Sequence, residues 1–308
     1  MQTCKPDPVR SLSEETKRWV ERAWEVRCGN FPMEIEFDYP EGTEVVTLTG
    51  KSCALDCAHC GGHYLEGMKT VEEVQGCGCP GHGHGSKKDG AKSCLISGGC
   101  DSHGKVPFMQ QLPFIEEMKR DKKLNFHVGL VNQAEIDTLE NLADVVSFDF
   151  VADNATISEV FGLGRTAEDY LNTYRALRKK VKVLPHICIG LKGGEIAGEY
   201  KAMDLLEEEG VDGLVFIVFI PTAGTRYAEK SPPPLEEVVN ILAEARVRFP
   251  DKPIFLGCMR PKGRYRQDLD LAAVKCGVNK IVVPTRAAVE LARDLGLEVL
   301  TGEECCVL

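Results

Sequence analysis

The sequence alternates short apolar runs with amphipathic segments along most of its length, and this alternation constrains the fold more than any other feature. Segments with helical periodicity separate the runs, which is the pattern that crossovers between parallel strands require. Each run has the length and composition of a strand buried on both faces of a parallel sheet. The runs occupy residues 45–50, 94–99, 124–131, 145–151, 181–191, 211–220, 254–258 and 278–284; the helical segments occupy 112–120, 134–142, 167–179, 196–209, 235–248 and 269–275.

Eight such units predict an α/β protein with a (β/α)₈ TIM-type barrel, in which reactive groups lie at the carboxyl ends of the strands. A doubly wound open sheet is the structural alternative. We expect a single domain over residues 1–308, with an N-terminal extension at 1–44 that holds a helix at 14–27. The barrel would span 45–295, and a short tail would span 296–308. Residues 69–92 break the alternation and indicate a long surface loop.

The composition excludes several classes of protein. Lys and Arg number 37 against 47 Asp and Glu, for a net charge of −10, which argues against a nucleic-acid-binding surface. No run of about 18 apolar residues occurs, so a membrane span is not expected. The first ten residues are polar and do not resemble a signal peptide, so we expect a cytoplasmic protein. Fourteen cysteines in such a chain favour metal or redox chemistry over disulfides.

Three of the cysteines follow the first apolar run in the order CxxxCxxC, as Cys53, Cys57 and Cys60. Three thiolates in one loop can bind three irons of a [4Fe–4S] cluster and leave the fourth iron open to another ligand. A structural zinc site would need four protein ligands. His59 is the nearest candidate, but its neighbour Cys60 already ligates, and adjacent residues seldom share one metal. The spacing therefore favours the cluster.

This motif resembles that of the radical S-adenosylmethionine (SAM) superfamily, and the resemblance extends over residues 45–260. In that superfamily the open iron binds the amino and carboxylate groups of SAM. One electron, supplied to the cluster by an external donor, cleaves SAM to a 5′-deoxyadenosyl radical, which abstracts hydrogen from the substrate. The protein places the cofactor, tunes the cluster and excludes water.

The resemblance assigns SAM-binding roles to residues at the ends of later strands. Gly98 and Gly99 match the glycine pair that meets the SAM amino group, where a side chain would block close approach. Asp153 would hold the ribose hydroxyls and Arg165 the SAM carboxylate, which a guanidinium can bind through two hydrogen bonds. The simpler interpretations are a tight turn at the glycines, a helix N-cap at Asp153 and a surface arginine.

Two further segments complete the SAM site that the resemblance implies. Glu195 ends the segment that resembles the family's glycine-ended fifth strand. Ile217 and Pro221 belong to the segment that matches the one cradling adenine.

The stretch from Asp153 to Leu177 looks like biotin synthase, which belongs to a branch that uses a second iron–sulfur cluster as a sulfur donor. Candidate ligands of such a cluster are Cys100, Cys258, Cys305 and Cys306. The pattern also departs from the known members of that branch. The third-strand cysteine of biotin synthase is absent, although Arg260 lies where that enzyme has a seventh-strand arginine. Only two cysteines precede the radical motif, where bacterial lipoyl synthase has three close together.

The archaeal-type lipoyl synthase, a two-protein system, is the remaining match in this branch. It implies sulfur insertion into an octanoyl-lysine on a carrier protein or peptide, with a partner radical SAM protein. A single-cluster radical SAM enzyme that acts on a small amino acid or matures a metallocofactor is the alternative. An iron–sulfur electron carrier or redox sensor is an alternative of another class. Cys77, Cys79, His82 and His84 indicate either a weak metal site or a solvated loop.

Overall fold

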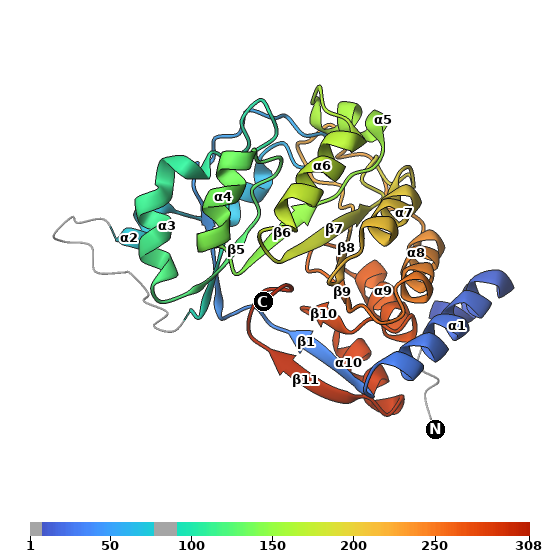
Figure 1. Ribbon diagram of the computed structural model, residues 1–308. Helices are drawn as coiled ribbons and strands as arrows, with labels where there is room; N and C mark the ends of the chain where they lie inside the picture. The colour runs from blue at the N-terminus through green and yellow to red at the C-terminus, as the bar shows by residue number, and fades with distance from the viewer. Residues whose placement is uncertain (1–7, 77–90) are drawn as a thin grey trace.

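A curled parallel sheet forms the centre of the molecule (Figure 1). The computed structural model describes residues 8–76 and 91–308. The sheet has 11 strands in the order β11-β1-β10-β9-β8-β7-β6-β5-β4-β2-β3, and its neighbouring strands are parallel. The prediction of an α/β fold of the TIM-barrel type is confirmed. Among the described strands, β11 and β3 are the two edges, so strand pairing does not close the ring.

Each of the eight predicted runs overlaps a strand of this sheet. The strands are β1 (Glu34–Asp38), β2 (Thr43–Thr47), β3 (Lys69–Thr70), β4 (Ser93–Ser97), β5 (Lys123–Phe126), β6 (Val145–Asp149), β7 (Val183–Ile189), β8 (Leu214–Val218), β9 (Ile254–Leu256), β10 (Lys280–Val282) and β11 (Glu298–Gly302).

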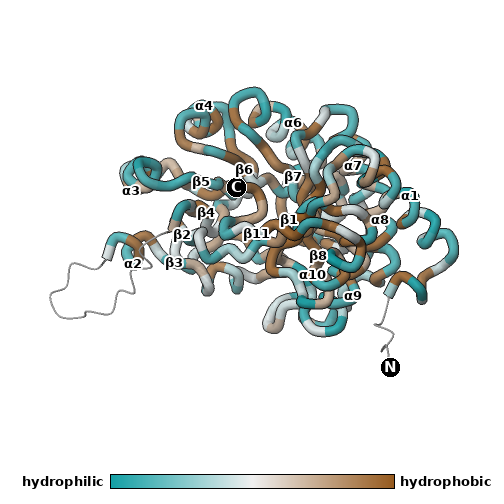
Figure 2. Tube along the Cα trace, turned by 90° about the horizontal axis from the view of Figure 1, so that it is seen from below, coloured by the Kyte–Doolittle hydropathy of each residue, from teal (hydrophilic) through white to brown (hydrophobic). Residues whose placement is uncertain are grey.

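Helices follow most strands and cover the outer face of the sheet. The α-helices are α1 (Glu14–Asn30), α2 (Val71–Gln75), α3 (Leu112–Lys119), α4 (Gln133–Leu142), α5 (Asn154–Thr156), α6 (Ala167–Leu177), α7 (Glu199–Glu209), α8 (Leu235–Arg248), α9 (Arg264–Lys275) and α10 (Arg286–Asp294). Figure 2 shows hydrophilic residues on their outward sides and hydrophobic residues along the strands. None of the helices in the described residues is long and apolar enough to cross a membrane.

Strands β1 and β11 lie in the predicted N-terminal extension and tail, where no strand was expected. Residues Glu36 and Lys280 are register partners between β1 and β10, and β1 also pairs with β11. Both strands mix charged and apolar residues, with burial patterns that are not continuous. They therefore lack the long apolar run by which the other strands were recognised.

The predicted loop at 69–92 holds β3 and α2 at its start. The four Cys and His residues singled out there, from Cys77 to His84, lie outside the described residues.

Residues 303–308, here called the 303–308 segment, follow β11 and fill the space between β1 and β2. The backbone N–H of Gly42 donates to the carbonyl of Glu303 at 2.7 Å. The N–H of Cys305 donates to Thr43 Oγ1 at 2.8 Å. The end of the chain consequently lies inside the curl of the sheet in both ribbon and tube views (Figures 1 and 2).

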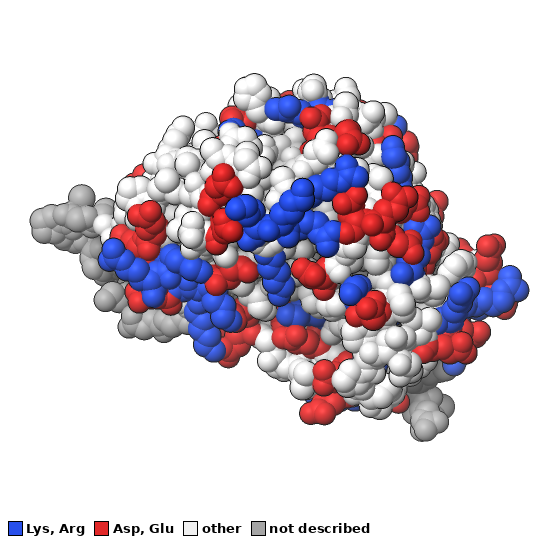
Figure 3. Space-filling view, viewed as in Figure 1, with Lys and Arg blue, Asp and Glu red and all other residues white. Residues whose placement is uncertain are grey.

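On the face seen in Figure 3, basic and acidic side chains are interspersed. Ion pairs of the described residues include Lys119 with Asp144 at 2.6 Å and Lys123 with Glu304 at 2.7 Å.

Candidate functional site

The loop with Cys53, Cys57 and Cys60 packs directly on the end of β4. A Cβ atom at Gly99 would lie 2.7 Å from the Cα of Cys53, so only glycine allows this approach. The N–H of Gly99 donates to Thr49 Oγ1 at 2.6 Å, and the N–H of Ala54 donates to the carbonyl of Cys100 at 2.8 Å. The glycine predicted from sequence and the cysteine motif are therefore parts of one site at the carboxyl end of the sheet.

The three motif cysteines form an electrostatically coupled group, and Cys100 joins it. A hydrogen bond from the sulfhydryl of Cys57 lowers the pKa of Cys60 to about 7. The same bond, with burial and the nearby thiols of Cys60, Cys53 and Cys100, raises the pKa of Cys57. Burial raises the pKa of Cys100 to about 12, with Cys53 as the next largest influence. Of Cys57, Cys60 and Cys100, Cys60 is consequently the thiol that ionises most readily.

A cavity of about 300 Å³ lies between this loop and the 303–308 segment. His59 and Tyr64 of the cysteine loop face it from one end, and Cys305 and Cys306 line it at the other. The walls between them come mainly from the inward-facing residues of the strands. These include Val45, Leu95, Asn125, His127, Ser147, Asp149, Val151, His186, Cys188, Ile217, Phe219, Gly257, Cys258, Met259 and Val282.

Two neighbouring strands and the residue after β5 place a polar group on one wall of this cavity. His127 Nε2 is 3.0 Å from Asp149 Oδ2, and the rings of His127 and His186 stack with centroids 6.2 Å apart. Although partial desolvation in the cavity opposes the effect, the imidazoles around Asp149, His127 first, lower the pKa of this carboxyl to about 2. Burial lowers the pKa of His186 to about 4. The wall thus presents the carboxylate of Asp149 paired with the imidazole of His127. The neutral imidazole of His186 stacks on that of His127.

The sequence analysis did not select His127, Asp149 or His186 as site residues. A signal was present, because Ser147, Asp149 and His186 are polar residues that interrupt otherwise apolar strands with a period of two. In a barrel, that period marks the side chains that face the interior.

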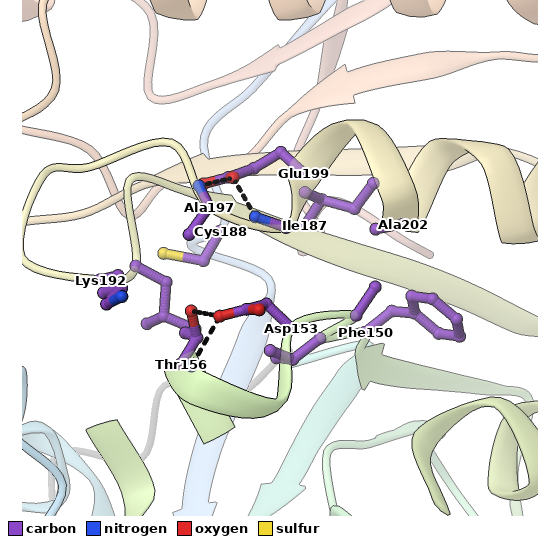
Figure 4. A pocket seen from close by; sticks show the side chains of 13 residues that line it. Phe150, Asp153, Thr156, Ile187, Cys188, Lys192, Ala197, Glu199 and Ala202 are labelled. Atoms are coloured by element: carbon purple, nitrogen blue, oxygen red, sulfur yellow. Dashed lines mark hydrogen bonds between the residues drawn. The ribbon is translucent and has the colours of Figure 1, made fainter. Parts of the chain in front are cut away.

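A second, smaller cavity of about 20 Å³ lies at the carboxyl ends of β6 and β7. Figure 4 shows Asp153 and Glu199 on two sides of it, with Cys188 between them. Asp153 Oδ2 accepts hydrogen bonds from the N–H and hydroxyl of Thr156, both at 2.7 Å, and so caps α5. Glu199 accepts three backbone N–H bonds, the shortest from Gly190 at 2.7 Å. Sequence reasoning did not select Glu199, whose carboxylate orders the loop after β7.

The other residues assigned to SAM occupy different positions. Ile217 and Ile220 line the large cavity, and Pro221 is the next residue in the chain after Ile220. Arg165 is partly exposed and lies 3.8 Å from Asp169 in an ion pair. Glu195 is exposed and lines neither of the two cavities.

The four thiols assigned to a second cluster fall into two groups. Cys258, Cys305 and Cys306 line the large cavity. Burial is the main cause that raises the pKa of Cys306, and the nearby Cys305 and Cys258 raise it further. Cys100 instead lies beside the CxxxCxxC motif. Arg260 is fully buried and paired with Asp270 at 2.7 Å, which leaves it no role as a ligand in the cavity. No group of three or more His, Cys, Asp or Glu within residues 8–76 and 91–308 is placed to hold a metal ion.

Solved structures that resemble the chain include the following three. Methylornithine synthase (PylB) matches with a TM-score of 0.64 and 14% identity, over 95% of this chain and 91% of that one. The FeFe-hydrogenase maturase HydG from Carboxydothermus hydrogenoformans matches with a TM-score of 0.65 and 16% identity, over 95% and 74%. Streptococcus suis SuiB bound to S-adenosylmethionine matches with a TM-score of 0.52 and 11% identity, over 75% and 52%.

Neither a protein-family model nor a curated protein sequence matches the chain. The identities to the solved structures are low, so these similarities concern the arrangement of the backbone. The chain has the α/β barrel fold that methylornithine synthase and the maturase HydG also have.

Proposed function

We propose that this protein is a radical SAM enzyme that binds a [4Fe–4S] cluster through Cys53, Cys57 and Cys60 and acts on a small molecule in the large cavity. The observation that carries the proposal is the contact between Gly99 and the cysteine loop at the mouth of that cavity. Reactive groups of barrel enzymes lie at this end of the sheet. A protein of similar fold, SuiB, has been solved with SAM bound.

The residues of the cysteine loop suit a [4Fe–4S] cluster. The thiols of Cys57 and Cys60 share a hydrogen bond, and the lowered pKa of Cys60 makes thiolate available near neutral pH. His59 Nδ1 is buried and has no hydrogen-bond partner among the described residues, so it can serve a bound group. When bound, the cluster would supply the electron that cleaves SAM.

The cavity supports a small substrate with both apolar and polar parts. Its volume of about 300 Å³ is at the lower end of the range for small-molecule sites. The Asp149–His127 pair offers hydrogen bonds in a cavity whose lining is otherwise largely apolar. A small amino acid or a metallocofactor precursor fits this description, and methylornithine synthase and a hydrogenase maturase share the fold.

The test is cleavage of SAM by the anaerobically reconstituted protein. With dithionite as the electron donor we expect 5′-deoxyadenosine and about four irons for each chain. Replacement of Cys53, Cys57 and Cys60 by alanine should abolish both. The control is Cys276→Ala, which removes a fully buried thiol at the end of α9, outside the cysteine loop. If the triple variant still cleaves SAM, the assignment is wrong.

The same experiment decides between an enzyme and an electron carrier or redox sensor. Cys100 lies beside the three motif cysteines and offers a fourth thiol, which an electron-transfer cluster needs. An iron-loaded protein that forms no 5′-deoxyadenosine would favour the carrier.

A second candidate function is sulfur insertion, as in lipoyl synthesis on an octanoyl-lysyl carrier with a partner protein. The observation that favours it is that Cys258, Cys305 and Cys306, far apart in sequence, line the same cavity. A second cluster bound by these thiols would lie within reach of a substrate in the cavity. The test uses the variant in which Cys53, Cys57 and Cys60 are replaced by alanine. Sulfur insertion is supported if this variant still binds iron after reconstitution and loses that iron when Cys258→Ala is added. If the variant without the three motif cysteines binds no iron, sulfur insertion is contradicted.

A further inference from the structure

The 303–308 segment enters the curled sheet from the end opposite the cysteine loop. Val307 is 4% exposed and packs with Val145, Leu184 and Val215 in a small apolar cluster. These three residues lie at or near the amino ends of β6, β7 and β8. The segment therefore closes the amino end of the barrel from within.

Hydrogen bonds fix the segment at this depth. The side chain of Asn125 donates to Cys305 Sγ at 3.2 Å, and the Oδ1 of Asn125 accepts from Ser147 at 3.0 Å. Cys306 Sγ lies 3.8 Å from His186 Nε2. Since His186 Nδ1 is 3.0 Å from the carbonyl of Leu184, its Nε2 is the free acceptor and the Cys306 thiol the donor. The side chains of Asn125, Ser147 and His186 at this end are thus already engaged within the protein.

The neighbouring Asp149–His127 pair, beside His186 on the same wall, differs in this respect. Asp149 and His127 pair with each other through one atom each, and both side chains remain partly accessible, at 48% and 36%. A ligand can therefore form polar contacts near the carboxyl ends of the strands. Toward the floor the polar side chains of Asn125, Ser147 and His186 already bond to the protein, so apolar side chains and thiols are what a ligand would contact there.

We propose that the 303–308 segment is part of the substrate site, with Cys306 as the residue that sets its depth. The proposal rests on the proposed function and deepens it. The substrate has an apolar end that points to the floor at Cys305 and Cys306, and a polar end that lies beside Asp149 and His127. A longer apolar end is excluded because Val307 and the strand residues around it fill the space below.

The experiment measures how the floor limits ligand length. Unbranched primary amides from butanamide to decanamide are titrated calorimetrically into the anaerobically reconstituted protein with SAM. Each added methylene that still fits should tighten binding by about fourfold, given about 0.8 kcal/mol for each buried methylene. Beyond a limiting chain length the affinity should fall. Cys306→Gly should move that limit to longer amides, and Cys306→Phe to shorter ones.

Cys94→Gly is the matched control, because Cys94 is 0% exposed in β4 and does not line the cavity. It should leave the limiting length unchanged. The proposal fails if the wild-type protein binds none of the amides, or if Cys306→Gly has the wild-type limit. Should Cys306→Phe not fold by circular dichroism, the Gly variant alone decides. Formation of 5′-deoxyadenosine without amide tests the proposed function separately, so the two failures are distinguishable.

Discussion

Gly99 shows at the scale of one residue how the site depends on a missing side chain. Its Cα faces the backbone of the cysteine loop, where a Cβ would stand 2.7 Å from both Cα and Cβ of Cys53. A flexible side chain can rotate away from a new Cβ atom, but the backbone of the cysteine loop cannot. The loop would have to move away from β4, and the geometry of the three thiols would change with it.

We therefore predict that Gly99→Ala loses most of the iron bound by the wild-type protein after reconstitution, while the helix content stays the same. Iron analysis and circular dichroism check the two parts. Gly164→Ala is the control, since a Cβ there has no neighbour within 4 Å. Wild-type iron content in Gly99→Ala would mean that the loop accommodates the methyl group without disturbing its ligands.

At the scale of elements, a buried ion pair ties β9, α9 and the end of β10 together. Arg260 and Asp270 have fully buried side chains and lie 2.7 Å apart. Arg260 also donates to the carbonyls of Val282 and Val283, and Asp270 accepts from the N–H of Thr285. Val283 has a positive φ of 49°, which is unfavourable for a β-branched residue. The pair thus holds the chain in this conformation behind the cavity wall.

Asp270→Ala should lower the free energy of unfolding by about 3–5 kcal/mol, because it leaves a buried guanidinium without a counter-charge. Urea denaturation measures the change. Asp268→Ala on the same helix is the matched control: it removes the ion pair with the exposed Arg264, at 2.7 Å, and should cost at most about 1 kcal/mol. Equal losses in the two variants would contradict the prediction.

At the scale of the whole molecule, the free energy of unfolding depends on the imidazole of His186 staying neutral inside the barrel. Burial lowers the pKa of this imidazole to about 4, whereas in the unfolded chain it is about 6.5. Between these two values the unfolded chain binds the proton and the folded protein does not. The free energy of unfolding therefore falls as the pH decreases through this window.

We predict that His186→Gln removes part of this pH dependence. From pH 6.5 to pH 4 the wild-type protein should lose at most about 1.4 kcal/mol more than the variant for each pH unit. Urea titrations at several pH values give the two slopes. His103→Gln, at an exposed position, should keep the wild-type slope. Parallel slopes for wild type and His186→Gln would show that another group carries the dependence.

The eight apolar runs were enough to predict the barrel-type sheet, because a strand buried on both faces must be apolar along its length. The spacing of Cys53, Cys57 and Cys60, followed by Gly98 and Gly99, was enough to locate the candidate cluster site. These features are local: each is readable within a few residues of the chain. The helices between the runs were predictable for the same reason.

Features that depend on residues far apart in sequence were decided only by the tertiary structure. β1 and β11 have no continuous apolar run, and they are strands because β10 offers β1 a partner. Cys305 and Cys306 lie in the barrel because β11 directs the chain into the gap beside β2. Asp149, His127 and His186 form a group because neighbouring strands place them on one wall. Sequence determines which side chains can face inward, but pairing between strands decides which of them meet.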